Sequence, residues 1–220
     1  MERPPRRVVQ NAWALRHGRL IGPHGLEFHD VPFPDETLTV TMRAYDPTWP
    51  ADFTLIAAEL RAALGDLART IDHVGSTSIP GMAAKDCIDI QVRVDRVDSD
   101  TIAPALFKIG YRLRDEPWNT SETSFGVTSP KLVFAPPVGA RRANVHVRAF
   151  GSTNARFALL FRDYLRRSPI ARQAWADFKL RLAQDVTDLY SYGQIKQPAM
   201  MVLMEAARCW AAESAWSPPD

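Results

Sequence analysis

HVGSTSIPG at residues 73–81, followed by Lys85 and by IDIQVRV at residues 88–94, is the stretch that decides the fold. Residues 71–74 predict a short buried strand that ends at the turn beginning with Gly75 and Ser76. In the second segment apolar residues alternate with polar ones, which predicts a strand with one polar face. A glycine and a small hydroxyl residue directly after a strand suit the binding of a phosphate group.

The residue types around this turn also indicate a chemistry. Gly75 lets a ligand approach the backbone closely, and the hydroxyl of Ser76 and nearby amides can donate hydrogen bonds. Asp89 lies on the following strand and shares a face with Gln91 and Arg93, because alternate residues of a strand point to the same side. A carboxylate beside a phosphate cradle is what magnesium-assisted phosphoryl chemistry needs.

Outward from this stretch, hydrophobic periodicity and capping residues predict further elements of both kinds up to residue 150. They are a strand over 38–42, a helix that opens at Asp46–Pro50 and stops at Gly65, a helix that Ser99 or Asp100 caps and Gly110 ends, and strands at 132–134 and 144–148.

The last third of the chain carries only helical periodicity. One apolar stripe runs from Phe157 to Leu165, a second helix starts at Ser168–Pro169, and a third follows Pro198. Strands mixed with helices, followed by helices alone, favour an α+β fold with a helical C-terminal lobe. We therefore expect an irregular N-terminal extension over residues 1–36, a core over residues 37–150 and a helical lobe over residues 151–220.

Composition excludes several classes of protein. The 220 residues are 46% apolar and 24% charged, and the net charge of +2 is too small to indicate a nucleic-acid partner. Cys87 and Cys209 give neither a disulfide framework nor a zinc spacing, which favours a reducing, cytoplasmic compartment. No apolar run approaches the roughly 18 residues that a membrane span requires, so we expect no membrane partner.

From residue 73 to residue 92 the sequence closely resembles the GrpB family, within the nucleotidyltransferase superfamily, whose signature couples a glycine–serine pair to an aspartate. Separate blocks in the same order extend this resemblance over roughly residues 38–210. They are YDP at 45–47 with WP at 49–50, VHV at 145–147, FRDYL at 161–165, and the spacing of Tyr192 and Lys196.

The resemblance implies a nucleotidyltransferase-like mixed sheet and a site for a magnesium-bound nucleoside triphosphate. The superfamily usually places a second acid where this chain has Gln91, and GrpB-like proteins commonly have a histidine where this chain has Asn144. Asp89, His146 and Glu116 remain as ligands for one divalent ion, which is not the usual two-metal clamp.

Two functions follow as hypotheses. In the first, the chain transfers a nucleotide to a small-molecule acceptor. The roles are then triphosphate binding by Gly75, Ser76 and Thr77, magnesium binding and catalysis by Asp89 with His146, charge compensation by Lys85 or Lys196, and ligand contacts from Tyr192 and Arg162. In the second, the chain is a non-catalytic nucleotide- or partner-binding module on a degenerate nucleotidyltransferase fold. A link to coenzyme A metabolism belongs to this hypothesis, because some GrpB-like regions are fused to dephospho-coenzyme A kinase.

Each of these residues also has a purely structural interpretation. Gly75 and Gly81 suit plain turns, and Ser76 suits a cap. The others suit ordinary surface or packing roles: a solvated Asp89, a satisfied strand histidine at His146, an exposed Lys85, a solvated helix face for Arg162, Arg166 and Arg167, packing of Tyr192 and Lys196, and a small core residue at Cys87.

Overall fold

The computed structural model describes residues 14–16, 19–21, 27–28 and 39–219. The chain forms two units, residues 1–36 and residues 37–220. In the first unit, strands β1 (Ala14–Arg16), β2 (Arg19–Ile21) and β3 (Glu27–Phe28) pair antiparallel in that order. The sequence predicted no regular structure there, because strands of two or three residues are too short to show a period.

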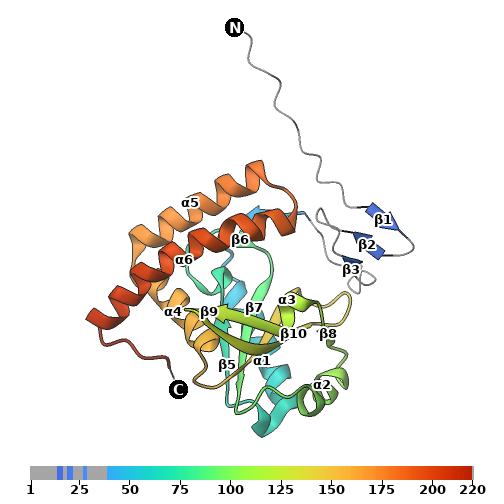
Figure 1. The fold of residues 1–220 in the computed structure, drawn as a ribbon. Coiled ribbons are helices and arrows are strands. Elements are labelled where there is room, and N and C mark those ends of the chain that lie inside the picture. The colour runs from blue at the N-terminus through green and yellow to red at the C-terminus, as the bar shows by residue number, and fades with distance from the viewer. Residues whose placement is uncertain (1–13, 17–18, 22–26, 29–38, 220) are drawn as a thin grey trace. The chain divides into compact units, whose positions relative to one another are not determined.

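A mixed sheet forms the centre of the second unit (Figure 1). Its order is β5-β7-β11-β10-β8, with β9 paired to β10, and only β7 and β11 run parallel. The strands predicted at residues 71–74, 88–94 and 144–148 are all present, and they lie next to one another as β5, β7 and β11. The strand bounds are β5 (Thr70–Val74), β7 (Ile88–Val94), β8 (Arg112–Arg114), β9 (Ser121–Ser124), β10 (Val127–Ala135) and β11 (Ala143–Ala149).

A separate ladder joins β4 (Met42–Arg43) to β6 (Ala84–Lys85). The strand predicted over residues 38–42 lies partly outside the described residues. Within them, Thr39 makes an isolated bridge to Asp188, and Val40 donates its amide to the Thr187 carbonyl at 2.7 Å.

Helices α1 (Trp49–Leu64) and α2 (Ser99–Phe107) pack against one face of the sheet. The fully buried side chains of Ile88 and Ile90 on β7 belong to this core. As predicted, α1 follows Asp46, which accepts hydrogen bonds from the Thr48 amide and hydroxyl, and it stops at Gly65. The cap of α2 is Asp98 and not Ser99 or Asp100, because the Asp98 carboxylate accepts from the Asp100 amide.

Helix α4 (Thr153–Arg167) lies across the other face, where it contacts β5, β9, β10 and β11. Helices α5 (Pro169–Asp185) and α6 (Leu189–Glu213) pack on α4 and enclose a second core, so the predicted helical C-terminal third is confirmed (Figure 1). Within the described ranges, none of the helices is both long and apolar enough for a membrane span.

The start of α6 differs from the prediction. The helix begins at Leu189, where the Asp188 side chain accepts from the Ser191 amide, and Pro198 lies inside it. A proline usually marks a first turn because it lacks an amide hydrogen. Here an earlier side-chain cap and burial of the preceding turns outweigh that local signal.

The polar face of β7 is also buried, although the alternation suggested a half-polar strand. Gln91 is 0% exposed and lies against Ala155 of α4, and Arg93 is 2% exposed and lies against Phe150 and Pro219. Gln91 donates to the Ala155 carbonyl and accepts from Arg148, whereas Arg93 pairs with Asp72 at 2.9 Å. Their polar groups therefore have partners inside the protein, as buried polar groups require.

Candidate functional site

The turn after β5 is built around Gly75, which has φ +68° and ψ −170°. This region of backbone conformation is accessible essentially only to glycine. A Cβ at this position would also overlap the Asp89 carboxylate oxygen Oδ2 and lie 2.8 Å from the Asp89 Cβ. Position 75 therefore needs a glycine, because Asp89 leaves no room for a side chain. The two predicted site residues Gly75 and Asp89 are in contact.

Residues 76–78 continue the turn as a short 3₁₀ helix. Thr77 is buried, and its hydroxyl shares a hydrogen bond of 3.0 Å with Nε2 of His73. His73 stacks on Phe53, and burial lowers the pKa of His73 to about 4. The Thr77 hydroxyl is therefore committed to the protein, whereas the Ser76 hydroxyl points to the lysines described below.

Asp89 lies beside Asn144 and His146 of β11, with 33% of its side-chain surface exposed. It accepts from Asn144 Nδ2 at 3.0 Å, and its Oδ1 lies 3.8 Å from His146 Nε2, so the two predicted side chains do share one face of the sheet. Burial raises the pKa of Asp89, but His146, Asn144 and Lys85 outweigh it and hold the pKa at about 2.

His146 has a divided environment. Burial lowers its pKa below the ordinary value, although Asp89 acts in the opposite direction. Nδ1 of His146 is buried and has no hydrogen-bond partner among the described residues. The histidine is therefore held mainly in its neutral form next to an ionised aspartate.

Lys85, Lys179 and Lys196 form a cluster of lysines beside the turn. The sequence indicates Lys85 and Lys196 as candidates but not Lys179. Lys179 of α5 is 3% exposed and donates from Nζ to Ser76 Oγ at 2.9 Å and to the Ala83 carbonyl at 2.6 Å. Burial, followed by the charges of Lys196 and Lys85, lowers the pKa of Lys179 to about 7. Burial and Lys85 lower the pKa of Lys196 to about 8.

Lys85 and Lys196 also flank the ring of Tyr192, with Nζ atoms 6.0 and 5.8 Å from its centroid. Tyr192 is buried, and burial raises its pKa to about 12. The ring thus lies close to both cations, and its burial fits the packing interpretation of this residue.

One signal could have revealed Lys179 beforehand. It lies four residues after Trp175 and three before Leu182, on the apolar stripe of α5. A charged residue in the buried stripe of a helix needs a partner, and that requirement alone marks it as a candidate.

The predicted metal set of Asp89, His146 and Glu116 is not assembled, so that prediction is wrong. Glu116 instead accepts from Arg114 at 3.2 Å and from Asn119 at 2.8 Å. Among the described residues, no group of three or more histidine, cysteine, aspartate or glutamate side chains is placed to hold a metal ion. Magnesium prefers several oxygen ligands, and one carboxylate facing three lysines does not fit it.

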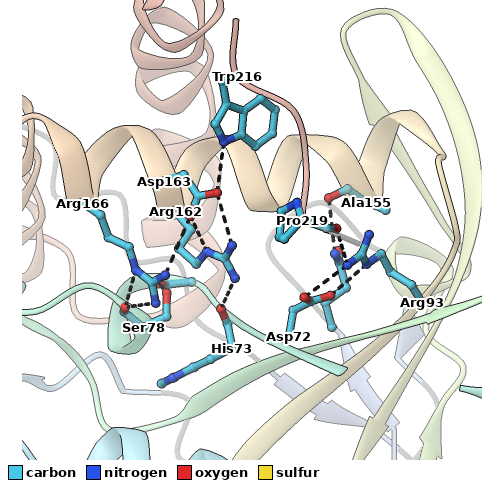
Figure 2. Close-up of polar contacts among 12 residues, drawn as sticks. Asp72, His73, Ser78, Arg93, Ala155, Arg162, Asp163, Arg166, Trp216 and Pro219 are labelled. Carbon is cyan, nitrogen blue, oxygen red and sulfur yellow. Dashed lines mark hydrogen bonds and ion pairs between the residues drawn. The ribbon is translucent and has the colours of Figure 1, made fainter. Parts of the chain in front are cut away.

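The predicted solvated face of α4 is corrected for Arg162, whereas Arg166 is exposed, with 41% of its side-chain surface accessible. Arg162 is buried and donates to the His73 carbonyl at 3.2 Å and to Asp163 at 2.7 Å (Figure 2). Arg166 donates to the Ser78 carbonyl at 3.0 and 2.8 Å, and Arg167 is exposed as predicted. Arg162, predicted to contact a ligand, is thus bonded to the strand that leads into the turn.

A mixed sheet with helices on both faces, and a glycine–serine turn beside a strand aspartate, defines the class of this domain as mixed α/β. The chain belongs to the GrpB family: the family model described as GrpB protein matches residues 39–206. A crystal structure of the conserved protein GrpB from Enterococcus faecalis is similar to it, with a TM-score of 0.64 and 25% identity, over 77% of this chain and 99% of that one.

Among curated proteins, a UPF0157 protein of Halalkalibacterium halodurans is 34% identical over 77% of this chain and 83% of its own length. A dephospho-CoA kinase of Mycolicibacterium paratuberculosis is 31% identical over 97% of this chain, and one of Mycobacterium bovis is 34% identical over 79% of it. The chain spans about half the length of these two kinases, 56% and 47% respectively.

Proposed function

We propose that this chain binds the phosphate groups of a nucleotide-class small molecule at the turn formed by Gly75 and Ser76. The observation that carries the proposal is the hydrogen bond from Lys179 of α5 to Ser76, with Lys85 of β6 and Lys196 of α6 close enough to act on Lys179 through their charges. Three cations opposite the single carboxylate of Asp89 leave an excess of positive charge. Burial and the repulsion between these lysines lower the pKa values of Lys179 and Lys196, and a bound anion would relieve the repulsion.

The names of the relatives suggest which nucleotide-class molecules to test. Two curated relatives are dephospho-CoA kinases, so coenzyme A precursors and adenosine triphosphate are the ligands that we propose first. We therefore propose a nucleotide- or partner-binding module linked to coenzyme A metabolism, and a cytoplasmic location belongs to the same proposal. Fold alone does not decide between binding and catalysis.

Nucleotidyl transfer to a small acceptor is the second candidate. The observation that favours it is the partly exposed and ionised Asp89 next to the turn. This function would need magnesium bound by Asp89 and by further carboxylates. The positions expected to supply them do not, because Gln91 is an amide buried beneath α4 and Glu116 is bonded to Arg114 and Asn119. We therefore derive no reaction step through a metal ion.

Calorimetric titration with adenosine triphosphate, dephospho-coenzyme A and pyrophosphate, each with magnesium and with a chelator, tests both candidates. We expect binding to persist in chelator. Lys196→Gln should weaken it by about 10- to 100-fold, the effect of losing one hydrogen bond to a charged group. Lys108→Gln, which removes an exposed lysine at the end of α2, is the matched control and should bind like the wild type.

The two candidates give different results. Binding that requires magnesium and that Asp89→Ala abolishes would favour nucleotidyl transfer over simple binding. No heat of binding with any of the three ligands, or equal affinity in the wild type and Lys196→Gln, would refute the phosphate site.

A further inference from the structure

The chain after α6 turns back onto the protein. Ala215 has φ +50°, a left-handed conformation, and the Trp216 amide donates to the Ala211 carbonyl at 2.9 Å. The indole of Trp216 then lies over α4, where its Nε1 donates to Asp163 Oδ2 at 3.1 Å (Figure 2). Arg156 contacts the same ring at 4.9 Å from its centroid. This segment, residues 214–219, lies outside the region that the family model matches.

Asp163 connects Trp216 to the two arginines of α4. Its carboxylate accepts from Arg162 Nε at 2.7 Å and from Arg162 Nη2 at 3.2 Å, and Arg166 Nη1 lies 3.8 Å from it. The Trp216 indole and Arg162 Nη2 share the oxygen Oδ2. A bidentate, partly buried pair of this kind fixes the guanidinium in one orientation.

The two arginines in turn hold both ends of the turn. Arg162 donates to the carbonyl of His73, two residues before Gly75, and Arg166 donates to the carbonyl of Ser78, which ends the 3₁₀ helix. Figure 2 shows both guanidinium groups directed at these carbonyls. The position of Ser76 and its neighbours therefore depends on where α4 places the two arginines.

A second contact joins the C-terminal segment to the same strand. The Pro219 carbonyl accepts from Arg93 Nη2 at 2.8 Å, and Arg93 Nε pairs with Asp72 of β5 at 2.9 Å (Figure 2). Asp72 directly precedes His73. Residues 214–219 thus reach β5 along two routes, one through α4 and one through the sheet.

We infer that Trp216 is a positioning residue for the turn at Gly75–Ser78, acting through Asp163, Arg162 and Arg166. Its indole holds the carboxylate that orients both arginines, and the arginines hold the backbone that would bind phosphate. The importance of this arrangement for ligand binding rests on the proposed function. The arrangement itself is a property of the protein without ligand and can be measured separately.

Hydrogen exchange of the full chain tests the positioning directly. Trp216→Phe keeps an aromatic ring but removes the N–H donor, and we expect exchange of the amides at residues 73–79 to rise roughly three- to tenfold, the effect of losing about one hydrogen bond locally. Trp210→Phe is the matched control, because Trp210 packs against Trp216 and does not bond Asp163 in the structure. Exchange in residues 73–79 should stay at the wild-type rate in that control.

A second variant and a second measurement complete the test. Asp163→Asn, which keeps the side-chain size, should raise exchange in the same segment even where Trp216→Phe folds poorly. Pyrophosphate titration should show weaker binding by Trp216→Phe than by Trp210→Phe at similar melting temperatures. Unchanged exchange at residues 73–79 in both Trp216→Phe and Asp163→Asn would overturn the inference, whether or not pyrophosphate binds. A wild type that binds no probe would overturn the proposed function alone.

Discussion

Gly75→Ala is the substitution for which the structure gives the sharpest expectation. The backbone of the new alanine must adopt φ +68° and ψ −170°, a conformation that costs an ordinary residue of order 1–3 kcal/mol. It also meets the Asp89 side chain, with Cβ at 2.8 Å and Cγ at 3.0 Å. Overpacking of this kind typically costs about 1–3 kcal/mol more. We therefore expect the free energy of unfolding to fall by about 2–6 kcal/mol.

Two further variants separate backbone strain from the steric overlap. Gly81→Ala also places an alanine at positive φ, +78°, but nothing lies within 4 Å of its new Cβ. It should lose only about 1–2 kcal/mol. In an Asp89→Ala background the overlap at position 75 is partly removed, so the double variant should be more stable than the sum of the single effects predicts, by at least about 1 kcal/mol.

Urea unfolding followed by circular dichroism at equilibrium measures these differences for all four variants and the wild type. Equal losses for Gly75→Ala and Gly81→Ala would contradict the overlap with Asp89. Strict additivity of Gly75→Ala and Asp89→Ala would do the same. Either result would mean that Gly75 serves the turn alone and is not fitted against the strand aspartate.

Two other predictions follow from the buried polar groups. The pKa values of Lys179 and Lys196, about 7 and about 8, lie below the ordinary 10.5, so from about pH 7 up to pH 10.5 the unfolded chain binds more protons than the folded one and stability should rise with pH. The rise in melting temperature from pH 7 to pH 9 should be smaller in Lys179→Met than in the wild type. An equal rise in both proteins would show that the buried Lys179 does not cause it. Gln91→Asp should lower the free energy of unfolding by about 1–3 kcal/mol, because the amide that donates to Ala155 is lost beneath α4, and it should not create magnesium-dependent nucleotide binding; calorimetry showing such binding would refute the placement of Gln91 outside the site.

Much of the fold was accessible from local pattern. The period-two alternation at residues 88–94 predicted β7, and helical periodicity after residue 153 predicted the C-terminal helices, because side-chain direction repeats differently in strands and helices. The glycine turn was found from a different local signal, because few residues other than glycine can adopt the φ and ψ of Gly75. Errors arose where two local signals competed, as at Pro198, which lies inside α6 and does not start it.

The candidate site was only half accessible from sequence. The resemblance grouped Asp89 with His146, and the structure places His146 Nε2 3.8 Å from Asp89 Oδ1. Lys179 was missed because its partner, Ser76, lies 103 residues away. Glu116 was misplaced because its own neighbours, Arg114 and Asn119, satisfy it locally.

The sequence by itself determined the order of strands and helices, the turn and the residues able to carry charge, because these depend on the stereochemistry of neighbouring residues. Tertiary structure alone decided which charges meet. It buried Gln91 and Arg93 of β7, joined Lys179 to Ser76 of the turn, and directed Arg162 and Arg166 to backbone carbonyls. A side chain's ionisation and partners depend on burial and on groups distant in sequence, and only packing fixes those distances.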